Sequence, residues 1–178
     1  METILETIEI ETGKNPAAAV IWMHGLGADG NDFVPVVKEL DLTGVPATRF
    51  VFPHAPKRAV TINNGFVMRA WYDVTLGDLE GTSRRADAAG VRESQESINA
   101  LIEREGKRGI PAGKIVLAGF SQGGAIALQT GLRYPKKLAG IMALSTYLPL
   151  ADSLPQEAAD ANKTAPLFMA HGVYDPVV

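Results

Sequence analysis

The sequence predicts an open α/β fold with a mainly parallel sheet and helices on both faces. Three observations predict it: apolar runs of strand length, helix-length stretches that alternate with them, and glycine-rich turns where such a run ends. The chain of 178 residues is close to the length of one domain. No repeat, low-complexity tract or linker divides it, so we treat residues 1–178 as a single domain.

The strands are predicted in chain order from their apolar patterns. Residues 3–11 alternate isoleucine with polar side chains, as an edge strand does. Residues 17–23 (AAAVIWM) are apolar on both faces, which is typical of a central parallel strand covered by helices. Further buried strands are predicted at 48–53, 114–119, 138–144 and 165–171.

Helices are predicted between these strands. Asn31 or Asp32 can cap a short helix that ends near residue 40. Longer helices are predicted over 83–105 and 121–134. The first of them places four apolar side chains roughly on one face, namely Val91, Ile98, Leu101 and Ile102.

Two segments lack a regular pattern. Residues 55–81 are rich in turn residues and aromatics, and long loops in compact α/β domains usually carry function. Residues 151–164 are polar and rich in alanine, which favours a short surface helix. The first segment is therefore a candidate for part of a ligand site.

Composition excludes several classes of protein. The 17 basic and 20 acidic residues give a net charge of −3, and the basic pairs are scattered, so we expect no nucleic-acid partner. The absence of cysteine excludes disulfides and thiol nucleophiles and agrees with a cytoplasmic location. The first residues lack the features of a signal peptide. The longest apolar stretch is far below the roughly 18 residues that a transmembrane helix needs.

The candidate nucleophile is Ser121. It lies in GFSQG at 119–123, which matches G-x-S-x-G between a predicted strand and a predicted helix, as that motif requires. The sharp turn needs glycines because a Cβ there would strike the strand and helix, and the Gln122 N–H is placed to donate to an oxyanion. The alternative is that Ser121 only caps the helix. The strand and helix on the correct sides favour the nucleophile.

A second glycine-rich stretch, GLGADG at 25–30, formally matches the dinucleotide fingerprint G-x-G-x-x-G. That fingerprint needs an acidic residue about 20 residues further on, where this chain has FVFP at 50–53. The favoured interpretation is a loop that brings the Leu26 N–H opposite that of Gln122 as the other half of an oxyanion hole. Nucleotide binding stays the weaker alternative.

The candidate acid is Asp175. It follows a predicted buried strand and comes after the nucleophile, the chain order expected for this motif. The alternative is a turn residue before Pro176.

Several segments together resemble a known family, the small bacterial carboxylesterases related to acyl-protein thioesterases and lysophospholipases. The segments are WMHGLGADG at 22–30, PHAP at 53–56 with Val60 and Thr61, MRAWYD at 68–73, GFSQGGA at 119–125, and His171-Gly172 with Asp175. They span nearly the whole chain in the family's order.

The resemblance implies an α/β-hydrolase without a large cap domain. It implies Ser121 as the nucleophile, Leu26 and Gln122 as the backbone oxyanion donors, and Asp175 as the acid. It also implies that Trp71 and Leu26 border an apolar acyl channel, although Trp71 could equally be a core aromatic. No metal and no cofactor are implied.

The chain departs from the family at the catalytic histidine, which should follow the acid. No histidine follows Asp175, while His24 lies in the oxyanion loop, His54 in the PHAP turn and His171 before the acid. We therefore expect the chain to lack its last strand–helix unit, on the order of 30 residues or more. The sheet edge exposed in this way could pair with a second copy to form a homodimer.

The predicted function is a serine hydrolase that cleaves carboxylic esters or thioesters of a small or lipid-like substrate through an acyl-enzyme on Ser121. Apolar residues near the site favour an aliphatic acyl group of short to medium length, namely Leu26, Phe66, Trp71, Val74, Leu76, Tyr147 and Leu148. Two alternatives stay open: an incomplete hydrolase that only binds acyl compounds, and a nucleotide-binding domain that uses residues 25–30.

Overall fold

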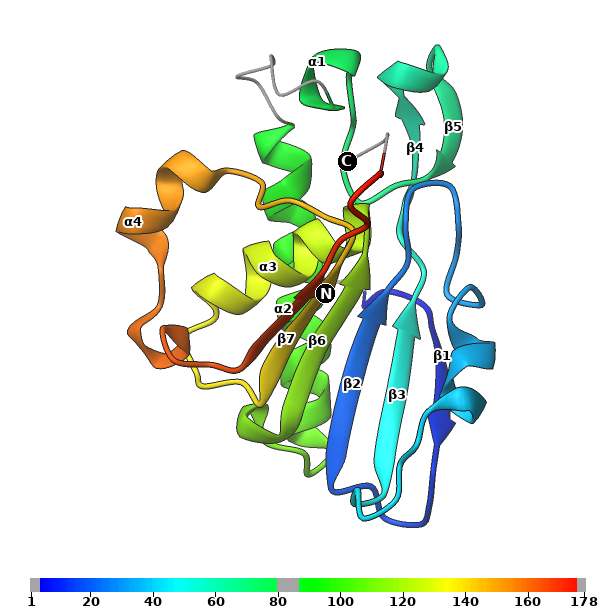
Figure 1. The fold of residues 1–178 in the computed structure, drawn as a ribbon, viewed down its shortest axis with the longest axis vertical. Helices are drawn as coiled ribbons and strands as arrows, with labels where there is room; N and C mark the ends of the chain where they lie inside the picture. The colour runs from blue at the N-terminus through cyan, green and yellow to red at the C-terminus, as the bar shows by residue number, and fades with distance from the viewer. Residues whose placement is uncertain (1–3, 80–86, 176–178) are drawn as a thin grey trace.

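A six-stranded sheet forms the centre of the computed structural model, which describes residues 4–79 and 87–175 (Figure 1). The strand order is β1-β3-β2-β6-β7-β8, and all neighbours are parallel except β1, which runs antiparallel to β3. The bounds are β1 (Thr7–Glu11), β2 (Ala18–Met23), β3 (Thr48–Pro53), β6 (Ile115–Phe120), β7 (Gly140–Leu144) and β8 (Leu167–Ala170). The positions of the predicted strands and the edge position of the first one are confirmed. The predicted burial of the strand before the acid is wrong, because β8 is exposed along its whole length.

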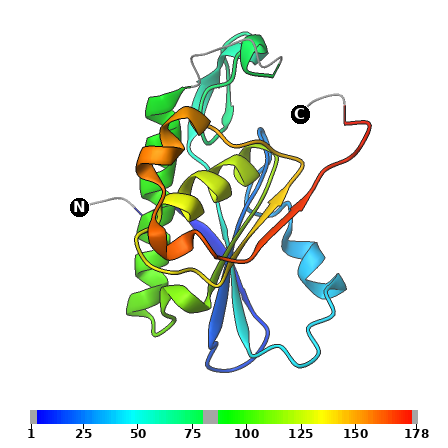
Figure 2. The ribbon, with the colours of Figure 1, turned by 60° about the vertical axis from the view of Figure 1, so that its left-hand side comes forward.

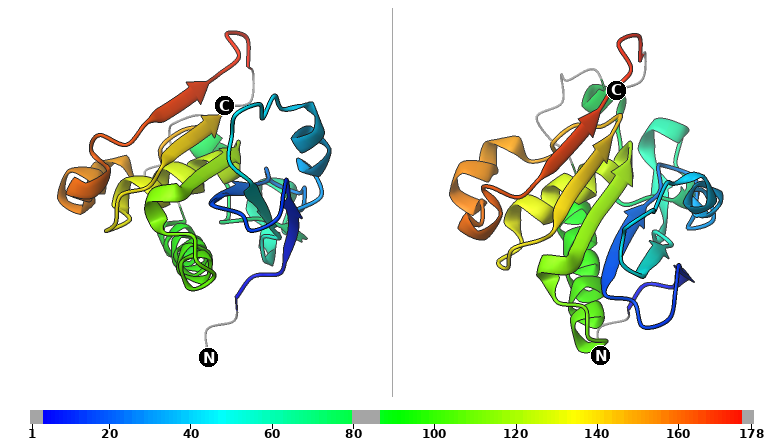
Figure 3. Two further views of the ribbon diagram at one scale, coloured as in Figure 1. Left: turned by 90° about the horizontal axis from the view of Figure 1, so that it is seen from below. Right: turned by 60° about the horizontal axis from the view of Figure 1, so that its bottom comes forward.

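Helices cover both faces of the sheet, as predicted (Figures 2 and 3). Helices α2 (Ala88–Lys107) and α3 (Gln122–Arg133) lie on one face, and a 3₁₀ helix, η1 (Val34–Glu39), lies on the other. The four side chains predicted for the inner face of α2 are all buried. Asp87 caps α2 by accepting a hydrogen bond from the Gly90 N–H at 2.9 Å, and residues 83–86 of the predicted helix lie outside the described residues.

The predicted cap of the first helix is wrong. Phe33, and not Asn31 or Asp32, precedes η1, and no side chain caps it. The Asp29 carboxylate instead accepts a hydrogen bond from the Asn31 N–H at 2.8 Å. Because of this local turn, the helix begins only at Val34. The proline near its start has no backbone N–H that would need a capping side chain.

The segments predicted to be irregular contain short elements. Residues 57–69 form a hairpin whose chain reversal uses the positive φ of Asn64 (55°) and Gly65 (75°). Its elements are β4 (Lys57–Val60), η2 (Thr61–Asn63) and β5 (Phe66–Arg69), followed by α1 (Leu76–Leu79). Residues 151–164 contain η4 (Ala151–Ser153), the surface helix α4 (Leu154–Glu157) and η5 (Asp160–Asn162), while η3 (Ala112–Lys114) precedes β6.

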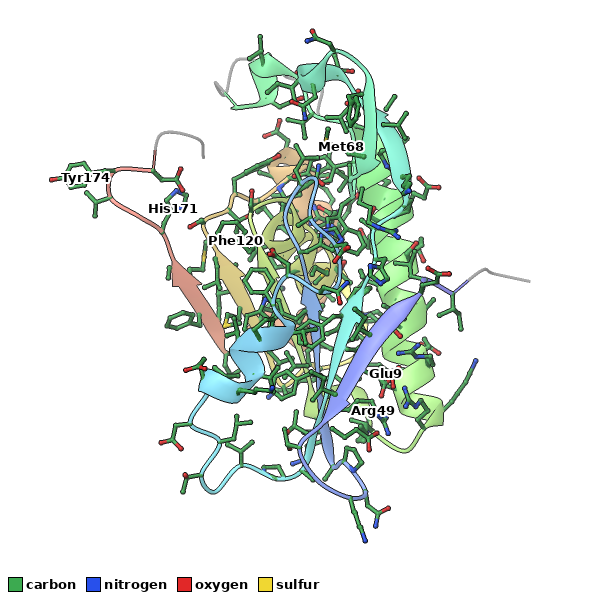
Figure 4. All side chains as sticks on the ribbon, turned by 90° about the vertical axis from the view of Figure 1, so that its right-hand side faces the viewer. Glu9, Arg49, Met68, Phe120, His171 and Tyr174 are labelled. Carbon is green, nitrogen blue, oxygen red and sulfur yellow. The ribbon has the colours of Figure 1, made fainter. Side chains whose placement is uncertain are left out.

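A buried ion cluster joins α2 to the β1 edge of the sheet. Glu105 is 0% exposed, and its carboxylate lies 2.6 Å from Arg49 and 2.8 Å from Arg108. Glu9 on β1 pairs with Arg108 at 2.8 Å, and Figure 4 shows Glu9 close to Arg49. A carboxylate without water needs such partners, so the cluster fixes α2 against the strands.

The opposite edge of the sheet is more open. On β8, Leu167, Phe168 and Met169 are each about half exposed, at 48%, 60% and 54%. The carboxyl ends of β2, β6, β7 and β8 meet at one end of the sheet because these strands are parallel, and ligands of open α/β sheets bind at such ends. Among the described residues, no helix is long and apolar enough to cross a membrane.

Candidate active site

Ser121 sits in a strained turn between β6 and α3. Its backbone has φ 52° and ψ −121°, a region that residues with a Cβ rarely adopt. The turn is held on both sides: the Ser121 N–H donates to Leu144 O at 2.9 Å, and Thr146 Oγ1 donates to Ser121 O at 2.6 Å. The Ser121 hydroxyl does not cap α3, so the alternative role as a helix cap is not what the structure shows.

The glycines of the motif are required by close packing. A Cβ on Gly119 would lie 2.2 Å from Gly123 O, and a Cβ on Gly123 would lie 2.4 Å from Met23 O. Gly124 would place a Cβ 2.8 Å from Thr146 Cγ2. The strand and helix can approach only without these side chains, as the sequence predicted.

The predicted oxyanion loop lies directly against the nucleophile. A Cβ on Gly25 would be 3.6 Å from Ser121 Cβ, and Gly27, at φ 77°, donates its N–H to Arg69 O at 2.9 Å. Leu26 between them lines the same cavity as Ser121 and Gln122. Gln122 is the first residue of α3, so its N–H has no acceptor within the helix. The two predicted donor residues thus meet beside the serine.

A cavity of about 290 Å³ opens beside Ser121. Of the apolar residues predicted around the substrate, Leu26, Val74 and Tyr147 line it. Phe66 and Leu76 lie on the hairpin and α1 and are 69% and 66% exposed. The other lining residues are Gly25, Ala28, Asp32, Ile62, Tyr72, Phe120, Ser121 and Gln122. Figure 4 shows Phe120 and Met68 toward the same end of the sheet.

Trp71 lies in the core beneath this cavity and is 0% exposed. Its indole Nε1–H donates to His24 O at 2.9 Å, and its carbonyl accepts from the Ser94 hydroxyl. Its neighbour Tyr72, and not Trp71, lines the cavity. The predicted substrate contact therefore falls on a residue that supports the oxyanion loop from below.

The Gln122 side chain has a role that the sequence did not reveal. Its Oε1 accepts from the Trp71 N–H at 2.7 Å, and its Nε2 donates to Tyr72 O at 2.7 Å. The buried amide thereby joins the start of α3 to the wall of the cavity. The available signal in the sequence was an amide residue, Gln122, directly after Ser121, together with a long loop rich in aromatic residues elsewhere in the chain.

Two of the three histidines are engaged in the loops around the site. The His24 Nε2 accepts from the Ala55 N–H at 3.1 Å, so its Nδ1 carries the proton and donates to Gly25 O at 2.7 Å. Burial lowers the pKa of His24, which favours this neutral form. His54 Nδ1 accepts from the Gly30 N–H at 3.1 Å. Both rings serve the glycine-rich loop at 25–30.

Asp175 lies on the loop that follows β8. Its N–H donates to Gly172 O at 3.1 Å, and its Oδ2 is 3.6 Å from His171 Nε2. Figure 4 shows His171 and Tyr174 on this loop beyond the sheet. The loop starts at the same end of the sheet as Ser121, because β6, β7 and β8 are parallel neighbours.

Within residues 4–79 and 87–175, no group of three or more histidine, cysteine or acidic side chains is arranged to hold a metal ion. The polar groups around the cavity beside Ser121 are its own hydroxyl, backbone N–H groups, tyrosine hydroxyls and the Asp32 carboxylate. Such an arrangement can hold a carbonyl carbon against a nucleophilic oxygen.

Comparison with known proteins agrees with this geometry. A family model described as phospholipase/carboxylesterase matches residues 5–178. Acyl-protein thioesterase 1 of Cryptococcus neoformans is 40% identical over 178 residues, covering 100% of this chain and 74% of that protein. Acyl-protein thioesterase 1 of Neurospora crassa is 44% identical over 168 residues, 90% of this chain and 68% of that protein. The crystal structure of Arabidopsis thaliana SOBER1 matches with TM-score 0.81 at 32% identity, over 90% of this chain and 76% of that one.

These likenesses confirm the predicted fold and the predicted enzyme class, a serine hydrolase of esters or thioesters. The weaker alternative of nucleotide binding gains no support, because the loop at 25–30 packs against Ser121. The relatives named above are fungal and plant proteins, so the resemblance is confirmed for the family as a whole. The chain belongs to the phospholipase/carboxylesterase family of α/β-hydrolases.

Proposed function

We propose that Ser121 is the nucleophile in the cleavage of a carboxylic ester or thioester, with the Leu26 and Gln122 N–H groups as the oxyanion donors. The observation that supports it most is the strained Ser121 backbone, at φ 52° and ψ −121°, beside a cavity lined by both donor residues. Strain of this kind persists only where the surroundings hold it, and it is common at catalytic nucleophiles.

The proposed reaction has two steps. Ser121 Oγ bonds to the substrate carbonyl carbon and loses its proton to a base, while the carbonyl oxygen takes the negative charge between the two N–H groups. The intermediate then expels the alcohol or thiol, which takes up the proton and leaves an acyl group on Ser121. Water attacks that acyl group in the same way, releases the carboxylic acid and restores the serine hydroxyl.

The acyl group is proposed to be aliphatic and of short to medium length. The cavity of about 290 Å³ is at the small end of ligand pockets, and Leu26, Ile62 and Val74 make part of its wall apolar. The relatives are named acyl-protein thioesterase, which supports a thioester as well as an ester. The bacterial kinship within the family stays a prediction.

The base is proposed to be a histidine outside these 178 residues, oriented by Asp175, in a domain whose last strand–helix unit lies beyond them. His24 and His54 are engaged by backbone groups of the loops around them. His171 lies against Asp175 itself, at 3.6 Å. An acid in this position fits the order in which triad residues occur in this fold.

The proposed function is tested with a fluorophosphonate, which bonds covalently to an activated serine. The intact mass is measured before and after exposure, and the adduct is mapped by peptide, with Ser121→Ala as the control. We expect one adduct on Ser121, absent from the control, in a protein heavier than 19.0 kDa, because the proposed base lies outside these 178 residues. An adduct on a chain of 19.0 kDa would instead make one of its three histidines the base. A folded chain of 19.0 kDa that takes no adduct would leave a protein that only binds acyl compounds.

A second copy of the chain is the protein partner we propose. Among the described residues, β8 is an edge strand of the sheet, and its three large apolar side chains are about half exposed. In the 178-residue chain, without the further strand–helix unit proposed above, this edge can pair with another strand. Sedimentation velocity at two concentrations tests this, and a monomer at both would contradict it. A cytoplasmic location is proposed from the cysteine-free sequence.

A further inference from the structure

The cavity wall contains a pair of tyrosine hydroxyls that the proposed reaction does not use. Tyr72 and Tyr147 both line the cavity, and their Oη atoms lie 2.7 Å apart. Ile62 and Val74, which line the same cavity, are apolar. Binding pockets fix the orientation of a ligand through a few polar groups in an apolar lining, so this pair is a candidate for substrate recognition.

One proton of the pair is left over. Each phenol has one proton to donate, and the bond between the two oxygens uses only one. Tyr72 is 2% exposed, and Tyr147 is the only acceptor that its hydroxyl reaches among the described residues. Either hydroxyl can donate. Because Tyr72 is almost fully buried and Tyr147 is more exposed, we assign the donor role to Tyr72, and the Tyr147 proton then has no acceptor among the described residues.

Burial raises the pKa of Tyr72 well above its usual value and also raises the pKa of Tyr147. Both phenols therefore keep their protons at neutral pH, and only one of the two protons is used in the bond between them.

Both tyrosines are fixed to the nucleophile turn through the backbone. Gln122 Nε2 donates to Tyr72 O at 2.7 Å. Thr146, the residue before Tyr147, donates its hydroxyl to Ser121 O at 2.6 Å. The Tyr147 hydroxyl therefore keeps a defined position relative to Ser121, which a group that selects between substrates requires.

The charges near the pair favour a neutral ligand. Asp78 lies close enough to raise the pKa of both phenols, after the larger effect of burial. Asp32 lines the same cavity. A carboxylate on the substrate would be repelled by both aspartates, whereas an uncharged oxygen would not.

We propose that the Tyr147 hydroxyl donates a hydrogen bond to an uncharged oxygen of the substrate. The substrates recognised in this way are esters or thioesters with an ether, hydroxyl or carbonyl oxygen in the arm that lies along the Tyr72–Tyr147 wall. This inference rests on the proposed function and adds the substrate class to it.

The test measures binding to the Ser121→Ala protein, so that no turnover interferes. Two ligand pairs of matched shape vary one arm at a time: ethyl pentanoate against ethyl 3-methoxypropanoate, and butyl acetate against 2-methoxyethyl acetate. Dissociation constants are measured by NMR titration. In the pair whose varied arm lies along the Tyr72–Tyr147 wall, we expect Tyr147→Phe to raise the dissociation constant of the ether ligand relative to that of its alkyl match. The expected change is about three- to tenfold, the net contribution of one hydrogen bond.

The matched control is Tyr72→Phe, which keeps the Tyr147 proton. We expect it to change the ether-to-alkyl ratio by less than about twofold, within the scatter of a neutral substitution. An unchanged ratio for Tyr147→Phe in both pairs would mean that this hydroxyl bonds only to water and would overturn the inference. Equal losses from the two variants, or binding of all four ligands weaker than about 10 mM, would also overturn it.

Fluorophosphonate labelling of the parent chain reports on the proposed function separately. An adduct on Ser121 with an unchanged ligand ratio would remove only the role of Tyr147. A changed ratio without an adduct would remove only the proposed hydrolysis.

Discussion

The ends of β6 and β8 lie at the same end of the sheet but are built differently. The turn after β6 is fixed from three directions: the Ser121 N–H bonds to Leu144 O, its carbonyl accepts from Thr146, and a Cβ on Gly123 would meet Met23 O at 2.4 Å. In the loop after β8, Val173 and Tyr174 are 90% and 94% exposed.

This difference shows which residues of the proposed active site are held rigidly by the fold and which lie on an exposed loop. Ser121 and the proposed oxyanion donors are held by buried backbone contacts, so their geometry does not depend on the loop that carries Asp175, the proposed acid. Asp175 takes its position from a turn with Gly172 and from its neighbour His171. Substitutions should therefore have large effects in the turn after β6 and small effects in the loop after β8.

The largest effect is expected from Gly123→Ala. The new Cβ would lie 2.4 Å from Met23 O and 2.5 Å from His24 O, so α3 must move away from the end of β2. We expect the free energy of unfolding to fall by about 3 kcal/mol or more. Ser121 should also lose its fluorophosphonate adduct, because the donors no longer face it. Urea unfolding and mass spectrometry measure the two effects.

The matched control for this variant is Gly172→Ala in the loop after β8. The nearest atom to its new Cβ would be Asp175 Cβ at 3.8 Å, an ordinary contact. We expect a stability change within about 0.5 kcal/mol. Equal losses at the two glycines would show that the turn after β6 and the loop after β8 are equally constrained.

A smaller loss is expected from Gln122→Met, which keeps the volume of the side chain. The variant leaves the Trp71 N–H and the Tyr72 carbonyl without their buried partner, and we expect a cost of about 2–3 kcal/mol. Gln156→Met, at an exposed position of α4, should be neutral in the same urea titration. A neutral Gln122→Met would mean that water replaces the amide in the wall of the cavity.

The sequence predicted the part of this site that follows from chain order and missed the part that follows from packing. From G-x-S-x-G between an apolar strand and a helix, the sequence predicted Ser121 and Gln122 in the turn between β6 and α3, where the structure has them, because that motif has one backbone geometry. It did not reveal that Trp71 is buried while Tyr72 lines the cavity. Both neighbouring aromatic residues are buried, and only three-dimensional packing, including the bond from the Trp71 indole to His24 O, separates the core residue from the one that lines the cavity.

Helix α4 lies between β7 and β8 along the chain and is joined to α3 by an ion pair between Glu157 and Arg133. The contribution of this ion pair to stability should depend on pH. Arg133 on α3, helped by Ser153 and Arg92, lowers the pKa of Glu157 on α4 from its usual 4.5 to about 2. The unfolded chain therefore takes up this proton first as the pH falls. The stabilisation is complete above about pH 4.5 and is lost progressively toward pH 2.

Urea unfolding at pH 6, 4 and 3 measures this dependence. We expect Glu157→Gln to be less stable than the parent chain at pH 6 and to approach it at pH 3. Glu39→Gln, which removes an exposed carboxylate on η1, should keep a constant difference from the parent. A gap for Glu157→Gln that widens on acidification would contradict the ion pair with Arg133.

The smallest effect is expected from His171→Ala, in the loop after β8. It is compared with His24→Ala, which changes the same residue type in the loop that packs against Ser121. The His171 side chain is 39% exposed and faces Asp175 at 3.6 Å, and exposed pairs of this kind contribute little. We expect a stability change within about 0.5 kcal/mol and Ser121 labelling within twofold of the parent. His24→Ala removes a buried ring that bonds to Gly25 and Ala55, so it should cost about 2–4 kcal/mol. If His171→Ala instead slows labelling 100-fold while the fold stays intact, His171 is the base and the acid loop takes part in activating the serine.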